Sequence, residues 1–238
     1  MGRLKICGIV LLAGLSVVGC GGVTQQAMQH GATSPIKSIA LLSIGQNDNY
    51  EYEEPMKAST TIGKFSSTNT DLSKEVSQGS LDGNTQIISN LHSSNYNISQ
   101  SLMNALKQQI GQKGIAVMGV HVKRNGHELL DEYKKTPSAG ADALLDVSPV
   151  TVGFKGARDE VFPLVNVQVR LVSARTREVL YQDTVRIGDD RKSPSLASER
   201  HYVRGGIGSL LREPGSQLTS LDGAVTTVAT YIASQLRP

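Results

Sequence analysis

The chain has 238 residues, of which 39% are hydrophobic and 19% are charged, and its formal net charge is +3 at neutral pH. This length is enough for one well-packed domain with long loops. No basic stripe with interleaved aromatic residues runs along the chain, which argues against nucleic-acid binding. Aromatic residues make up only 4% and Trp is absent, which argues against a sugar-binding protein.

The first nineteen residues carry the features of a bacterial lipoprotein signal peptide. Arg3 and Lys5 give a positive start, and residues 6–15 form an uncharged apolar run that is too short to span a bilayer core of roughly 30 Å as a helix. The segment Val17-Val18-Gly19-Cys20 then matches a lipobox. We therefore predict a signal peptide at residues 1–19, with cleavage between Gly19 and Cys20 and lipidation of Cys20. The alternative is an ordinary secretory signal that happens to contain a cysteine.

The lipobox also predicts where the protein resides. Gly21 follows the cysteine, and in lipoprotein sorting of Gram-negative bacteria an Asp at this place would favour the inner membrane. We therefore expect an outer-membrane protein that faces the periplasm, held by two or three acyl chains on Cys20. Cys7 leaves with the signal, so the processed chain has no thiol for a disulfide, a catalytic cysteine or a zinc-thiolate site. Loss of Arg3 and Lys5 lowers the net charge to about +1.

Residues 20–34 comprise the lipidated cysteine and a predicted flexible tether. The fourteen residues after Cys20 have a typical end-to-end distance of roughly 20 Å and a limit of roughly 45 to 50 Å. A domain at residues 35–238 is therefore expected to stay close to its membrane. Its first predicted element is a buried strand over residues 36–44, which is apolar and lies between Pro35 and Gly45.

A long polar insertion is predicted over residues 45–95. Ser, Thr, Asn, Gln and Gly dominate it, and a loop of this length inside a domain is either disordered or functional. Residues 59–67 and 85–91 contain β-type residues with weak alternation, which leaves an extended hairpin open as an alternative.

Asn97 is predicted to cap a helix. Four apolar residues then follow at spacings of four and form one stripe: Ile98, Leu102, Leu106 and Ile110. Gly111 and Gly114 are expected to end this helix. A strand over residues 115–122 and a short helix over 128–135 are predicted to come next.

Three strands and a closing helix are predicted in the rest of the chain. They are a strand over 141–152, in which Pro149 marks a bend or an edge, and a hairpin of 162–172 with 179–187. The first hairpin strand alternates, with apolar residues (Val165, Val167, Val169 and Leu171) on one face and polar residues (Asn166, Gln168 and Arg170) on the other. A second polar insertion covers 188–219, and the last helix starts at about Leu221. The predicted fold is a single-domain α/β mixed-sheet sandwich in the order β-α-β-α-β-β-β-α, with helices packed on the sheet and two long insertions.

The lipobox, the tether and the core patterns at residues 38–42, 101–106, 114–117 and 140–145 resemble one superfamily of periplasmic lipoproteins. It includes the curli-secretion lipoprotein CsgG, the penicillin-binding-protein activator LpoB and the amino-terminal domain of TolB. The resemblance covers residues 35–187 and 221–238, apart from the insertions, and implies a periplasm-facing adaptor or assembly domain that is often oligomeric, with no catalytic signature. The curli channel builds a barrel from membrane hairpins, and residues 45–95 are too polar for such strands.

No arrangement of side chains predicts an enzyme, a metal site or a cofactor. His121 and His127 are six apart and lack metal-ligand spacing, and the glycines at 205–208 lack the Lys-Ser/Thr of a phosphate loop. Asp189 and Asp190 adjoin Arg191 and Lys192, as in a solvated loop. We expect a non-enzymatic protein.

Partner contacts are expected on the two insertions, because loops on a rigid scaffold commonly carry binding. The candidate contact residues are Tyr50, Tyr52 and Tyr202. The leading hypothesis is an adaptor or assembly factor for an envelope machine, bound to the membrane through Cys20 and to an unidentified envelope protein. The alternative is a homo-oligomeric component of a secretion or export channel.

Overall fold

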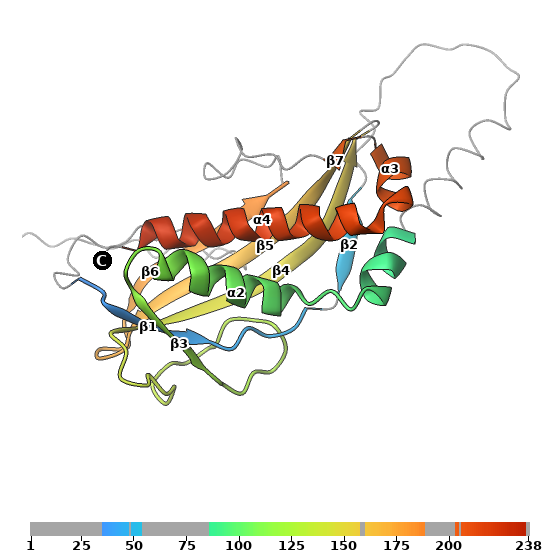
Figure 1. Ribbon diagram of the computed structural model, residues 1–238. Coiled ribbons are helices and arrows are strands. Elements are labelled where there is room, and N and C mark those ends of the chain that lie inside the picture. Colours follow the sequence, from blue (N-terminus) through green and yellow to red (C-terminus); the bar gives the residue numbers. More distant parts are fainter. Residues whose placement is uncertain are drawn as a thin grey trace, which may run out of the picture.

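A mixed sheet of seven strands forms the centre of the computed structural model, which describes residues 35–47, 49–53, 86–157, 160–188, 203–204 and 206–236 (Figure 1). The strands are β1 (Ser38–Leu42), β2 (Tyr50–Glu53), β3 (Ala116–Val120), β4 (Ala143–Ala157), β5 (Glu160–Ser173), β6 (Val179–Ile187) and β7 (Val203–Arg204). The helices are α2 (Ile98–Gly111), α3 (Gly206–Arg212) and α4 (Pro214–Gln235), and residues 86–93 are also helical. The predicted α/β mixed-sheet fold is confirmed.

The long pair β4 and β5 organises the sheet. The main order is β3-β1-β4-β5-β6, with β1 parallel to β3 and β4, and with β5 antiparallel to both of its neighbours, β4 and β6. Beyond β1, the short β2 pairs with residues 152–155 of β4, and β7 pairs with residues 160–161 of β5. The register shifts between Pro149 and Thr151, as expected for a proline that has no N–H to donate. Among the described strands, β1 pairs with β4 only as far as Leu145 and β2 only from Val152, so Pro149 lies at a bulge where that side of β4 has no strand partner, in agreement with the predicted bend or edge.

Helices α2 and α4 cover one face of the sheet, side by side (Figure 1). The predicted stripe of α2 is fully buried, and Asn97 caps the helix by accepting a hydrogen bond from the Gln100 N–H. The alternation predicted for β5 also holds, because Val165, Val167 and Val169 are buried in the same core. The described residues include no helix that is long and apolar enough to cross a bilayer.

The segment 121–140 lies on the opposite face of the sheet, and it is not helical over 128–135. The predicted helix there is wrong. The backbone N–H of Leu130 and the hydroxyl of Tyr133 both donate hydrogen bonds to the Asp146 carboxylate. Contacts with a distant strand replace the hydrogen bonds that a helix would make.

Ordered elements also occur inside both predicted insertions. The weak β alternation at 85–91 is overturned, since residues 86–93 form a helix whose Ile87 and Leu91 lie one turn apart and are buried. In the second insertion, α3 is present and α4 begins at Pro214, seven residues before Leu221. Residues 59–67 lie outside the described part.

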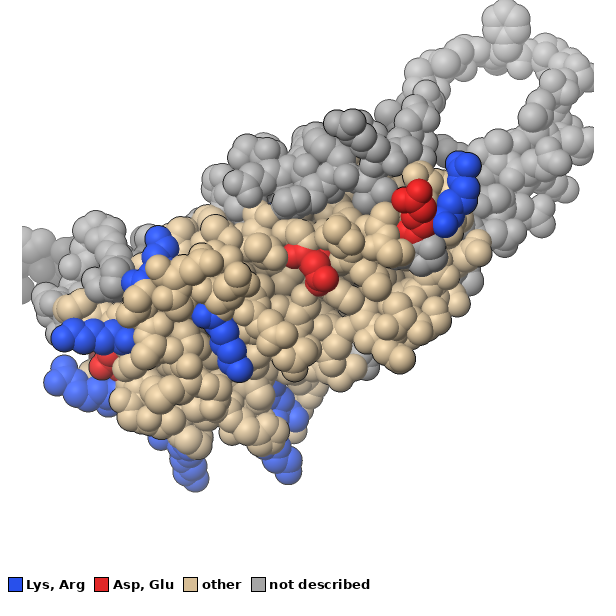
Figure 2. All heavy atoms as spheres, viewed as in Figure 1, with Lys and Arg blue, Asp and Glu red and all other residues tan. Residues whose placement is uncertain are grey.

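The domain has two distinct ends. At one end lie residue 35, the starts of β1, β3 and β4, and the β5–β6 turn; hydrogen bonds join Ala116 to Lys37, Asp142 to Ser38 and Ala174 to Asp142. At the other end lie β2, β7, α3 and the start of α4 (Figure 1). Figure 2 shows Lys and Arg side chains gathered at the first end. Fifteen residues of β4 correspond to roughly 50 Å between the two ends.

Candidate functional site

The face of the sheet turned away from α2 and α4 is only partly covered, and polar side chains line it. Cross-strand pairing aligns Ser148 with Gln168 and Thr184, and Asp146 with Arg170 and Gln182. Gln168, Arg170, Gln182 and Thr184 are half-buried. The alternation that sends the valines of β5 into the helical core sends these polar groups to the other side. We call this surface the open face.

A buried ion pair fixes the segment 121–140 to the open face. Asp146 is fully buried and pairs with Arg124. Its second oxygen accepts hydrogen bonds from the Leu130 N–H at 2.8 Å and the Tyr133 hydroxyl at 2.6 Å. Burial, together with the Asp146 charge, raises the pKa of Tyr133, so this hydroxyl remains a donor. A buried charge needs this full set of partners.

Arg170 contributes a second cation, which forms no salt bridge with any described carboxylate. Its guanidinium donates to the Gln182 side chain at 2.7 Å and to the Leu130 carbonyl at 3.1 Å, and it lies 5.7 Å from the centre of the Tyr133 ring. Among the described residues the only salt bridge is the one between Arg124 and Asp146. Arg170 is therefore held in place by neutral groups, and its charge is not neutralised by a direct ion pair.

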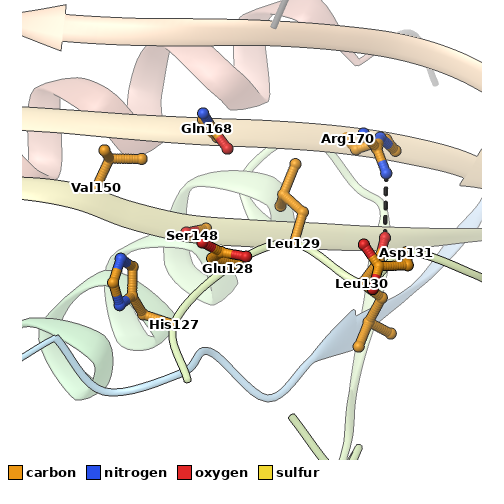
Figure 3. A pocket seen from close by; sticks show the side chains of 9 residues that line it. All are labelled: His127, Glu128, Leu129, Leu130, Asp131, Ser148, Val150, Gln168 and Arg170. Carbon is orange, nitrogen blue, oxygen red and sulfur yellow. Dashed lines mark hydrogen bonds between the residues drawn. The ribbon is translucent and has the colours of Figure 1, made fainter. Parts of the chain in front are cut away.

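A pocket of about 250 Å³ opens between the strands and residues 127–131 (Figure 3). Side chains from β4, β5 and the loop converge on it: His127, Glu128, Leu129, Leu130, Asp131, Ser148, Val150, Gln168 and Arg170. Ser148 is only 1% exposed and its hydroxyl has no hydrogen-bond partner. Val150 is 37% exposed at the rim. The pocket thus combines a buried hydroxyl that has no partner, a guanidinium, an imidazole, two carboxylates and an apolar edge.

This arrangement suits binding better than covalent chemistry. A nucleophilic serine needs a base within hydrogen-bond reach, and the Ser148 hydroxyl contacts no such group. His127 also lines the pocket, but the Ser148 hydroxyl forms no hydrogen bond with it. No cluster of three or more metal-ligating side chains occurs in the described ranges.

The three tyrosines predicted to contact a partner are not gathered into one exposed site in the described part of the chain. Tyr50 is 7% exposed; its hydroxyl donates to the Tyr96 carbonyl at 2.6 Å and its ring meets His92 edge-on at 5.2 Å. It packs in the core, and contact with a partner would require it to leave that place. Tyr52 pairs with Phe154 through the backbone. Tyr202, Gly19 and Cys20 lie outside the described residues.

Sequence reasoning missed the residues of the open face. Asp146 stands inside the apolar run of residues 143–147, and a charged residue in a predicted buried strand was the signal available. Arg124 and Arg170 could not be assigned as its neighbours, because they lie 22 and 24 residues away in sequence. β2 lies inside the first predicted insertion and β7 inside the second, and both pair with the tip of β4 and β5, at the end opposite residue 35.

Comparisons with known proteins give similarity of fold only. No family model matches the chain, and no curated protein matches it in sequence. Among solved structures, the chain is similar to the PelC dodecamer from Paraburkholderia phytofirmans, with a TM-score of 0.36, 12% identity and coverage of 91% of this chain and 96% of that one.

Two further structures are similar to a comparable or lesser degree. Protein XCC0632 from Xanthomonas campestris has a TM-score of 0.33, 7% identity and coverage of 90% and 93%. The LpoB C-terminal domain from Salmonella enterica, a protein named in the sequence resemblance, has a TM-score of 0.15, 15% identity and coverage of 66% and 87%. At identities and TM-scores this low, the assignment of a function rests on this chain's own residues.

Proposed function

We propose that the chain is a lipid-anchored protein of the bacterial envelope that binds a protein partner through the open face and has no enzymatic activity of its own. The observation that carries this proposal is the half-buried polar surface around Ser148 and Arg170. Polar groups that are largely withdrawn from water but not fully paired are stabilised when a partner supplies the missing hydrogen bonds. An adaptor or assembly factor is the role that fits such a surface.

The anchor is proposed from the lipobox at residues 17–20. Residues 21–34 then connect Cys20 to the first described residues, so the domain is restricted to a zone near the membrane. A tethered domain meets a membrane-bound partner at a raised effective concentration, so a modest interface is sufficient.

A second candidate is a homo-oligomeric component of a secretion or export machine. The observation that favours it is the pair of different sheet edges, β3 on one side and β6 on the other. Unpaired strand edges can accept another chain, and a contact between two different edges is heterologous, which closes into a ring when the rotation permits.

In-cell photo-crosslinking distinguishes these readings. A photoreactive amino acid replaces Gln168 or Thr184 on the open face, and Thr226 or Thr230, exposed on α4, serves as the matched control. We expect a discrete adduct with a different envelope protein from the open-face positions and none from α4. An adduct with a second copy of the chain favours the oligomer, and equal labelling from all four positions contradicts the proposal.

The anchor is tested separately by incorporation of labelled palmitate. The wild-type chain is expected to take up the label and to sediment with membranes. The Cys20→Ala variant, which has no thiol for the lipid, should do neither. Equal labelling of both chains would contradict lipidation at Cys20.

A further inference from the structure

The end of the domain at which residue 35 lies carries a net positive charge, and the opposite end does not. We call the first the basic end and define it by Lys37, Lys113 and Arg175, all of them exposed. Lys113 follows the last turn of α2, Lys37 precedes β1, and Arg175 lies in the turn between β5 and β6. The backbone hydrogen bonds between residues 116 and 37, 142 and 38, and 174 and 142 place these three loops in one row.

The balance of charges at the two ends is unequal. The described residues of the basic end include four cations and two carboxylates, a net charge of +2: Lys37, Lys113, Arg175 and Arg177 with Asp142 and Glu178. Those of the opposite end include three cations and four carboxylates, a net charge of −1: Lys155, Arg204 and Arg212 with Glu51, Glu53, Glu160 and Glu213. Figure 2 agrees with this difference in charge, because Lys and Arg side chains gather at one end of the molecule in that view.

Asp142 forms no salt bridge with the basic side chains of this end in the described part of the chain, although its charge interacts with that of Lys37. One of its oxygens accepts hydrogen bonds from the Lys37 N–H, the Ser38 N–H and the Ser38 hydroxyl, each at 2.9 Å. Its carboxylate thus joins the start of β1 to the start of β4 through hydrogen bonds. No salt bridge involves Lys37, Lys113 or Arg175, within the part of the chain that the structure describes. Lys113 also offsets the partial negative charge of the last carbonyls of α2.

We infer that the basic end rests on the anionic phospholipid headgroups of the membrane that holds the anchor, with Lys37, Lys113 and Arg175 toward the lipid. This inference rests on the proposed lipid anchor. Residues 21–34 lead from Cys20 to this end of the domain, so the tether delivers this end, and not the opposite one, to the bilayer. Basic side chains near an anionic membrane surface each add about a five-fold bias toward contact.

The orientation has a consequence for the rest of the molecule. With the basic end at the lipid, the long axis of β4 and β5 stands away from the membrane. The end formed by β2, β7 and α3 then lies roughly 50 Å from the surface, given the fifteen residues of β4. The open face, which runs along the same strands, is presented sideways to partners and is not covered by lipid.

Fluorescence quenching on the lipidated protein in nanodiscs tests the orientation. The processed chain has no thiol other than Cys20, so Thr176→Cys gives one labelled position at the basic end and Gly215→Cys gives one at the opposite end. An added Cβ at Gly215 meets nothing within 4 Å. A quencher on the lipid headgroup is expected to quench the probe at residue 176, and not the probe at 215, in discs that contain phosphatidylglycerol.

Two variants with equal loss of charge give the decisive comparison. Lys113→Ala with Arg175→Ala should reduce the ratio of docked to undocked protein on the order of twenty-fold. Lys123→Ala with Arg212→Ala, two exposed cations away from the basic end, should leave the ratio unchanged. Raising the salt shortens the screening length from about 10 Å at 0.1 M to about 3 Å at 1 M and should act like the first variant.

The outcomes separate this inference from the anchor itself. Protein that stays in the disc but shows equal quenching at residues 176 and 215 overturns the orientation and leaves the anchor intact. The same holds if quenching at residue 176 is as strong in discs of phosphatidylcholine alone. Protein that is not retained by the discs at all contradicts the anchor, and the orientation with it.

Discussion

Arg124 and Asp146 form an ion pair whose side chains are 5% and 0% exposed. Arg124 also donates to the Ser43 carbonyl at 2.5 Å and to the Glu128 carbonyl at 2.8 Å, so the pair joins β4, the end of β1 and the segment 121–140. The long segment between β3 and β4 has no regular structure of its own. This pair is therefore what gives it a defined position over the sheet.

Removal of Asp146 is expected to be severely destabilising. Asp146→Ala leaves a buried guanidinium without its counter-charge, and breaking a buried pair in this way costs about 3 to 5 kcal/mol. Asp146→Asn keeps an acceptor for the Leu130 N–H or the Tyr133 hydroxyl and should cost less. Urea unfolding followed by circular dichroism measures both, with exposed Glu132→Ala as the control, expected to change stability by less than about 0.5 kcal/mol. A loss below about 1 kcal/mol for Asp146→Ala would show that the pair is not needed.

Tyr50 is expected to act through folding stability. Its hydroxyl bond to the Tyr96 carbonyl is worth about 0.5 to 1.5 kcal/mol, which Tyr50→Phe removes. Tyr50→Ala empties a buried site beside His92 and should cost about 3 to 5 kcal/mol. Thermal unfolding of the wild type and the two variants measures their stabilities, and we expect the wild type to be the most stable and Tyr50→Ala the least. If both variants are as stable as the wild type while partner crosslinking falls, Tyr50 belongs to a binding surface instead.

The elements that were predicted correctly are those specified by local patterns. The four-residue spacing of the α2 stripe and the alternation of β5 report which side of each element is buried, and Asn97 carries its own cap. The helix predicted at 128–135 failed because distant Asp146 takes the N–H of Leu130. The early start of α4 was missed because Pro214 was read as part of a loop, although proline is favoured in a first turn.

The open face could not be assembled from the sequence, for a similar reason. Arg170 was correctly placed on the polar side of its strand, but its neighbours Tyr133 and Gln182 come from two other parts of the chain. Periodicity gives the side of a strand and not the identity of the residues across from it. The ion pair of Arg124 with Asp146 depends on the same long-range pairing.

Gly153 is required by the contact between β2 and β4. A Cβ built on it would lie 1.8 Å from the Glu51 carbonyl oxygen, so Gly153→Ala must push β2 away from β4. Overpacking of this kind costs about 1 to 3 kcal/mol or more. The matched control is Gly111→Ala at the end of α2, where an added Cβ meets nothing within 4 Å and helix propensity favours alanine by about 1 kcal/mol. Unfolding midpoints should therefore move in opposite directions, and a neutral Gly153→Ala would contradict the observed closeness of the two strands.

Asp142 makes stability dependent on pH at the basic end. The Ser38 hydroxyl and then the Lys37 N–H hold the pKa of Asp142 below its ordinary value, so this group stabilises the folded protein above its unfolded pKa. That contribution is lost as the pH falls through the lower, folded pKa. Ser38→Ala removes the largest cause and should raise the pKa of the Asp142 carboxyl, measured by NMR titration of its side-chain carbon. An unchanged Asp142 titration in the variant would mean that the hydroxyl does not donate to the carboxylate in solution.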